Sequence, residues 1–328
     1  MLAERVPNAI ATAELLVDYW NAEGLRAQSL GDRDLALGRA ALEALQKRAK
    51  YPFITTNLVD AATGKPLFKR FEVFTAGSGA RAVKLAVFGL MSLRGAGPDA
   101  TSGLRIEPPI DAMKAALAEA RAAGGFDAMI VLSQLNERDE TAVAETVPEV
   151  QLFLGGDSMG MSPDADSRGQ ALAFQASQKG KHLGFLKLGF DDPKGPGAPL
   201  FDPTRKSGLE RKKADAQRRI DMYQRLIDEA AATPPAPAAA PDAGPAPAQP
   251  NRRKAPTEMY ERQLTAARAE LQLAEEQLAS LADASGQPRR NTAAAELVPL
   301  GRDVADDEEI KLRVETFRKT WPDPTPGH

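Results

Sequence analysis

Hydrophobic and polar positions follow two alternating periods along residues 1–200. Helical spacing of apolar residues predicts helices over 5–24, 37–49 and 109–123, with one more between 133 and 150. Apolar runs between them predict strands over 26–30, 52–60, 69–75, 82–90, 128–133 and 150–156. The run over 82–90 is apolar enough to be buried on both faces. The pattern predicts an α/β domain whose functional side chains lie where the core strands end.

Residues 205–284 carry a different pattern, the alternating three and four spacing of a coiled-coil seam. The residues expected to form this interaction seam include Tyr223, Ile227, Leu264, Leu271 and Leu278. A Pro/Ala-rich stretch over 231–255 separates the two halves, and its prolines exclude a helix. We expect an antiparallel helical hairpin with a disordered tip; the alternative is two helices lying flat on the α/β domain. Residues 285–328 are expected to form a C-terminal extension with one helix at 306–320.

Composition excludes several classes of function. The 328 residues contain two His and no Cys, so the chain forms no disulfide and no thiolate metal site. A formal net charge of −3 argues against a nucleic-acid binder. No stretch approaches the roughly 18 consecutive apolar residues of a membrane span. The N-terminus also lacks the basic and then apolar layout of an export signal.

Six segments of the first 190 residues resemble, in order and spacing, the calcineurin-like metallophosphoesterase domain of bacterial 5′-nucleotidases and UDP-sugar hydrolases. They are LGDRDLALG (30–38), YPFITTNLVDAATGKPLF (51–68), VKLAVFGLMS (83–92), FDAMIVLSQLN (126–136), VQLFLGGDSM (150–159) and FQASQKGKHLGFLKL (174–188). The resemblance implies an α/β sandwich with two metal ions at the carboxyl ends of its strands. In that family the ions activate a water and hold a phosphate.

When the family's catalytic motifs are compared with this sequence position by position, their catalytic residues are missing. The family's Gly-Asn-His-Glu stands here as residues 31–34, in which Asp32 replaces a metal-binding Asn and Arg33 replaces a His. The fourth residue of this motif is Asp34. Three further positions at which the family has His hold Gln134, Asp157 and Met159. The opening Asp-X-His strand of the family precedes the point where this chain begins. Catalysis by the family mechanism is therefore not expected.

The leading hypothesis is a non-catalytic 5′-nucleotidase-like domain, without a cofactor, that acts as a structural or protein-interaction module. A protein partner or a preceding N-terminal segment is expected to complete the sheet, and the coiled coil to pair within one chain or between two. The C-terminal part is similar to the junction between such domains and multihaem cytochrome modules in extracytoplasmic relatives. The resemblance thus implies a periplasmic or extracellular place beside an electron-transfer assembly.

Four alternatives stay open for the motif at 31–34. A surviving pocket of Asp32, Gln134 and Asp157 would bind an anion, or weakly a divalent cation such as Ca²⁺ or Mg²⁺. With a rearranged metal site, the domain would instead be a working metal-dependent phosphoesterase. A non-hydrolysing nucleotide or phosphate binder would use Arg33 beside backbone N–H groups. The fourth reading is purely local, with Asp32 and Asp34 forming a helix cap and an ion pair with Arg33.

Overall fold

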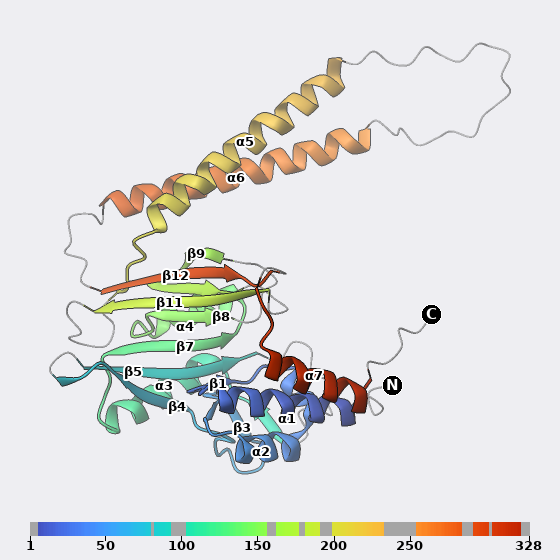
Figure 1. Ribbon diagram of the computed structural model, residues 1–328. Helices are drawn as coiled ribbons and strands as arrows, with labels where there is room; N and C mark the ends of the chain where they lie inside the picture. Colours follow the sequence, from blue (N-terminus) through green and yellow to red (C-terminus); the bar gives the residue numbers. More distant parts are fainter. Residues whose placement is uncertain are drawn as a thin grey trace. The chain divides into compact units, whose positions relative to one another are not determined.

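The computed structural model describes residues 6–79, 82–92, 103–155, 162–176, 181–190, 199–232, 254–283, 291–301 and 304–322 (Figure 1). Two compact units divide the chain: residues 1–202 with 290–328, and residues 203–289. This division differs from the expected one, in which residues 285–328 formed an extension of their own. Residues 291–299 return to the first unit because they pair with the strand at 182–190.

A six-stranded mixed sheet forms the centre of the first unit. Its strands follow the order β4 (Phe71–Ala76), β5 (Val83–Met91), β7 (Ala128–Gln134), β8 (Leu152–Gly155), β10 (Ala171–Gln175) and β9 (Ser162–Arg168). The four inner strands are parallel, and the two edge strands β4 and β9 are antiparallel to their neighbours. Residues 86–91 of β5 are all buried, as their continuous apolar run predicted. The predicted α/β fold is confirmed.

Helices and a second pair of strands cover the two faces of this sheet. Helices α3 (Pro109–Ala122) and α4 (Glu137–Thr146) pack on one face, where the core contains Phe88, Met113, Met129, Val143 and Phe153. On the other face, Val87, Ile130 and Leu172 share a core with the ribbon of β11 (His182–Phe190) and β12 (Asn291–Pro299). Nine residue pairs join β11 and β12, from His182 opposite Pro299 to Phe190 opposite Asn291.

The N-terminal segment forms a third core beside the sheet. Its elements are α1 (Val6–Ala22), β1 (Gln28–Ser29), η1 (Asp34–Leu37), α2 (Arg39–Arg48), β2 (Phe53–Ile54) and β3 (Leu58–Asp60), with β6 (Leu104–Ile106). The single strand expected over 52–60 is two strands, because β2 pairs with β1 and β3 pairs with β6. Between them, the Thr56 N–H donates to the carbonyl oxygen of Gly89 in β5 at 2.6 Å. This contact fixes the N-terminal segment to the central sheet.

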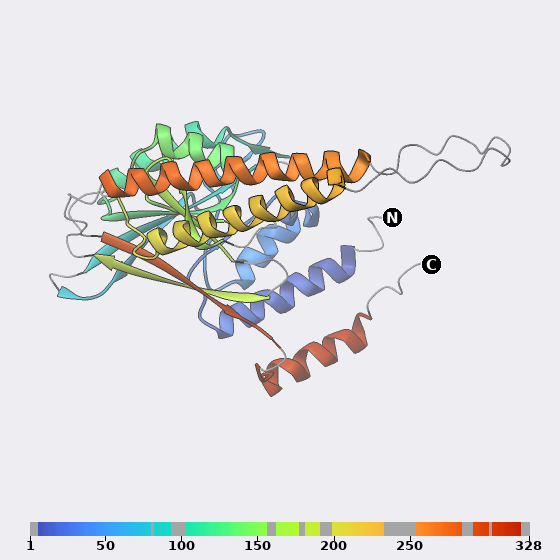
Figure 2. The same ribbon diagram turned by 90° about the horizontal axis from the view of Figure 1, so that it is seen from above.

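The second unit consists of α5 (Arg205–Ala232) and α6 (Lys254–Asp283), which run side by side in opposite directions (Figures 1 and 2). The rings of Tyr223 and Tyr260 stack with centroids 6.4 Å apart. Nearer the other end, Lys213 Nζ and Glu275 Oε1 form an ion pair at 2.8 Å. Of the expected seam residues, Leu264 is buried, whereas Tyr223, Ile227, Leu271 and Leu278 are half-buried. Residues 233–253, most of the expected disordered tip, lie outside the described residues.

A last helix, α7 (Glu308–Thr320), follows β12 in the first unit. Its first turn is capped by Asp307, whose side chain accepts a hydrogen bond from the Ile310 N–H at 3.0 Å. Within the described ranges, no helix combines the length and the apolar character needed to cross a membrane.

Candidate functional site

The loop of Gly31, Asp32, Arg33 and Asp34, called here the 31–34 loop, is closed by its own last side chain. The Gly31 N–H donates to Oδ2 of Asp34 at 2.8 Å, and the Asp34 N–H donates to the Gly31 carbonyl oxygen at 3.1 Å. Leu35, the next residue, is fully buried in the N-terminal core and anchors the loop. Arg33 is exposed, and the ion pairs between described residues do not include it. The loop is therefore a self-bonded turn that leads into η1.

Burial changes the acidity of Asp34. It raises the pKa of this carboxyl above its ordinary value of 3.8, and the neighbouring charge of Asp32 adds to the rise, while the hydrogen bond from Gly31 opposes it. The fold thus favours the neutral carboxyl more than water does. A metal ligand needs a charged carboxylate that faces the ion. Asp34 instead turns inward and bonds to the backbone of its own loop.

Gln134 lies beside the 31–34 loop, as the sequence predicted for residues at strand ends. A Cβ atom added to Gly31 would lie 3.4 Å from Oε1 of Gln134 and 3.5 Å from its Cδ. On its other side, the carbonyl oxygen of Gln134 accepts a hydrogen bond of 3.3 Å from the Ser92 hydroxyl at the end of β5. The structure therefore brings the loop, β7 and β5 together. Asp157 and Met159 lie outside the described residues.

The described part of this site does not fit a dinuclear metal centre. Among the described residues, no three His, Asp or Glu side chains are placed to hold one ion. The carboxylate of Asp34 accepts the hydrogen bond that closes its own loop, so it does not face a metal ion. Gln134 has a neutral amide at the position where the family has an imidazole ligand. We therefore derive no reaction step through a metal ion here.

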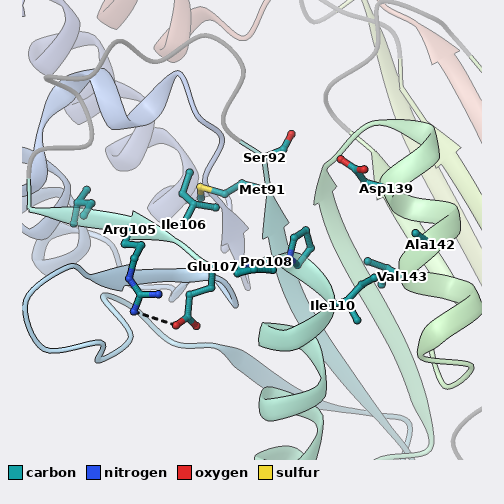
Figure 3. A pocket seen from close by; sticks show the side chains of 12 residues that line it. Met91, Ser92, Arg105, Ile106, Glu107, Pro108, Ile110, Asp139, Ala142 and Val143 are labelled. Atoms are coloured by element: carbon teal, nitrogen blue, oxygen red, sulfur yellow. Dashed lines mark ion pairs between the residues drawn. The ribbon is translucent and has the colours of Figure 1, made fainter.

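A cavity of about 620 Å³ lies next to these strand ends (Figure 3). Met91 at the end of β5, the following Ser92, the strand β6, the start of α3 and the first turns of α4 line it. Most of its lining is apolar, with Ile106, Pro108, Ile110 and Val143 facing the space in Figure 3. A cavity of this size and character is typical of small-molecule sites.

Three charged side chains stand at the border of the cavity. Arg105 Nη2 and Glu107 Oε1 are 3.4 Å apart, and Glu107 is also paired with Arg70 at 3.2 Å. Asp139 accepts a hydrogen bond of 2.6 Å from the side chain of Asn136, the N-cap of α4. The cavity was not predicted, because the strand β6 that supplies Arg105 was not expected from the sequence. Along the chain next to Arg105 and Glu107, the sequence predicted only the helix that starts at Pro109.

No protein-family model matches the chain, and no curated protein matches it. Solved structures similar to it include the sulfate thiohydrolase SoxB of Thermus thermophilus, with 27% identity and a TM-score of 0.48 over 53% of this chain and 32% of SoxB. A 5′-nucleotidase precursor, also from Thermus thermophilus, has 23% identity and a TM-score of 0.46, covering 56% of this chain and 39% of its own. The calcineurin-like phosphoesterase YfkN from Bacillus subtilis has 15% identity and a TM-score of 0.45, covering 53% and 60% respectively.

The chain thus spans about a third of SoxB and less than two thirds of each of the other two structures. Over about half of its own length it is similar to structures described as a sulfate thiohydrolase, a 5′-nucleotidase precursor and a calcineurin-like phosphoesterase. The last two descriptions name the family that the residues at 30–38 and at the strand ends resemble.

Proposed function

We propose that the chain is a non-catalytic 5′-nucleotidase-like domain that serves as a structural or protein-interaction module. The observation that carries this proposal is the state of Asp34. Its carboxyl is partly buried, which raises its pKa, and it accepts the hydrogen bond that closes the 31–34 loop. A carboxyl that is engaged by the backbone of its own loop is not directed at a metal ion or a phosphate. The residue types at Arg33 and Gln134 support the same conclusion, since neither supplies an imidazole.

The helical unit supports the interaction role. It is a self-contained pair of helices, closed by the Tyr223–Tyr260 stack and by the Lys213–Glu275 ion pair, and it requires no catalytic residue. The exposed surface of a helix pair is a common recognition surface. Placement outside the cytoplasm beside an electron-transfer assembly, and completion of the sheet by a partner protein or an N-terminal segment, are parts of this proposal that rest on the family resemblance.

Metal content and hydrolysis together test the absence of catalysis. The chain is purified without chelators in the presence of Mn²⁺ or Zn²⁺, its metal is measured by elemental analysis, and a panel of nucleotides and phosphodiesters is assayed. We expect less than one equivalent of metal and no turnover above the buffer rate. Two bound equivalents with turnover that Asp32→Ala abolishes would overturn the proposal. Glu23→Ala, at an exposed position outside the site, is the matched control.

The interaction role is tested by removing the helices. Replacing residues 205–288 with a short Gly-rich linker should leave the first unit folded, because β11 and β12 pair through nine residues without them. We expect the variant to keep the thermal unfolding of the first unit and to lose association with its partner. A variant that associates as strongly as the complete chain would contradict the assignment of this role to the helices.

The cavity favours one second candidate, a binder that does not hydrolyse its ligand. Its volume of about 620 Å³ and its apolar lining, with Arg105 at the border, suit a small molecule that joins an apolar ring to an anionic group. A bound nucleotide should raise the Tm in proportion to the logarithm of its concentration. Ala142→Phe, which fills the cavity, should remove this shift, whereas Glu145→Phe on the exposed face of α4 should not. Flat curves over a nucleotide panel would dismiss this candidate.

A further inference from the structure

The large exposed hydrophobic side chains of α5 and α6 occupy a single heptad position. Met222, Met259 and Leu273 are 41%, 51% and 54% exposed. Each of them immediately precedes a residue of the seam, namely Tyr223, Tyr260 and Ala274. Residues at one heptad position lie in one line along a helix. The three side chains therefore form regular stripes outside the seam.

An ion pair shows that these stripes lie on the same side of the helix pair. Arg219 of α5 and Glu270 of α6 are bonded across one edge of the seam. Met222 follows Arg219 by three residues, and Leu273 follows Glu270 by three residues, so both side chains point to this edge. Met259, two heptads before Leu273, shares its line.

The opposite edge is polar. It is marked by the hydrogen bond of 3.4 Å between Arg268 and Gln224. Its outward positions hold polar or small side chains: Ser207, Ala214, Asp221, Asp228, Glu258, Thr265, Gln272 and Ala279. Among the side chains that the structure describes, only one side of the helix pair is therefore suited to bury apolar surface against another molecule.

The large exposed apolar residues of α6 are arranged symmetrically about Ala266. Met259 and Leu273 lie seven residues before and after Ala266, about 10 Å on either side of it along the helix axis. A second α6 running the opposite way would thus place Leu273 against Met259 and Ala266 against Ala266. A small residue at the centre lets two helices approach to about 8–10 Å. Arg262 and Glu270, four residues before and after Ala266, would also meet with opposite charge.

We infer that this side of the helix pair is where two copies of the chain associate, with α6 against α6 in antiparallel orientation about a two-fold axis at Ala266. A two-fold contact needs a self-complementary surface, and the palindromic stripe and its flanking charges supply one. Met222 lies between Arg219 and Tyr223, whose partners are Glu270 and Tyr260, so it borders the middle of the stripe. The inference rests on the proposed interaction role and names its partner.

Sedimentation equilibrium of the full chain over a micromolar concentration series tests the association. We expect a dimer that Met259→Glu combined with Leu273→Glu weakens about a hundredfold, since central apolar anchors dominate such contacts. The control, Thr265→Glu with Ala279→Glu, adds the same charge at the same 14-residue spacing on the polar edge and should leave the dimer unchanged. Helicity by circular dichroism should be equal in both variants, because all four positions are exposed. A wild-type chain that stays monomeric, or a control that dissociates equally, would overturn the inference.

Single cysteines test the orientation, since the chain has none of its own. Under mild oxidation Ala266→Cys should form a disulfide with its own copy, whereas Thr265→Cys should not. Met259→Cys should cross-link to Leu273→Cys in a mixed sample but not to itself. Self-linkage of Met259→Cys would indicate a parallel pair and overturn the inference. The metal and hydrolysis assays do not involve the helices, so a monomer without turnover refutes only this pairing, and turnover with bound metal refutes only the proposed function.

Discussion

Gly89 is a position where the N-terminal segment closely approaches the central sheet. It lies among the fully buried residues of β5, and the chain of β2 passes directly over it. A Cβ atom added at this point would overlap the carbonyl oxygen of Ile54 and lie 2.8 Å from Oγ of Ser29. The overlapping atom belongs to the backbone, so no side-chain rotation relieves it. Gly89→Ala must therefore push β2 away from β5.

The free-energy loss follows from the contacts at this crossing. Two hydrogen bonds join the strands here, from the Thr56 N–H to the Gly89 carbonyl at 2.6 Å and from the Gly89 N–H to Oγ1 of Thr56 at 3.0 Å. Weakening both removes about 2 kcal/mol. Overpacking of a rigid core adds about 1–3 kcal/mol. The free energy of unfolding of the first unit should fall by about 3–5 kcal/mol, and its Tm by roughly 10 °C or more.

Thermal and urea unfolding, followed by circular dichroism and tryptophan fluorescence, measure this loss. The matched control is Gly184→Ala, where the added Cβ would lie 3.5 Å from Cδ2 of Leu297 and 3.7 Å from Cβ of Ala176, which are ordinary contacts. The control also removes a glycine from a strand, so it corrects for the entropy of the unfolded chain. It should change the free energy of unfolding by less than about 1 kcal/mol. Equal effects of the two substitutions would refute the argument from close backbone approach.

Three further substitutions probe buried or paired polar groups. Because the fold raises the pKa of Asp34, its stabilising contribution is complete below the unfolded value of 3.8 and is lost as pH rises. Asp34→Asn, which keeps an oxygen for the loop, should therefore raise the Tm at neutral pH but not below pH 3.8; an equal change at both pH values would contradict this. The pH dependence has the opposite sign at Asp60, because hydrogen bonds from Arg39, and then from Thr63, lower the pKa of this carboxyl. Its stabilising contribution is present above pH 3.8 and is lost as pH falls. Asp60→Asn should therefore lower the Tm at neutral pH, and the Tm values of variant and wild type should converge in acid. The buried Asn57 side chain makes three hydrogen bonds, to the carbonyls of Met91 and Glu107 and from the Met91 N–H. Asn57→Ala removes them and should lower the free energy of unfolding, measured by urea titration, by about 2–4 kcal/mol. A loss below about 1 kcal/mol would show that other hydrogen bonds replace them.

Local pattern was sufficient for the elements that pack on the central sheet. The helix expected over 109–123 is α3 at Pro109–Ala122, and the strand expected over 128–133 is β7 at Ala128–Gln134. The strands β6, β9 and β12 were not predicted, and the sequences of the last two argue against a strand. SPDADSR in β9 has the polar composition of a turn, and NTAAAELVP in β12 favours a helix. Both are strands because a distant partner, β10 or β11, offers its backbone groups.

For the candidate site, the structure can be compared with the sequence at only some of the predicted positions. The rule that functional residues gather at strand ends placed residues 31–34 and Gln134 together, and the contact of Gly31 with Gln134 agrees with it. The inward turn of Asp34 could not be foreseen, because the rise of its pKa depends on how far the folded chain buries its carboxyl. The cavity beside it was missed for the same reason: β5, β6, α3 and α4 each contribute one wall.

The place of the helical unit in the chain shows the same limit of local pattern. Its heptads were visible from sequence, but its insertion between two paired strands was not, since β12 was not predicted. Phe190 and Asn291 are opposite each other at the open end of the ribbon, so about 100 residues leave and return at one point. Closing a loop of about 100 residues instead of about 10 costs only about 2 kcal/mol more. The nine residue pairs between β11 and β12 and the bridge between Phe201 and Thr292 offset that cost. The first unit can therefore carry the helices without depending on them.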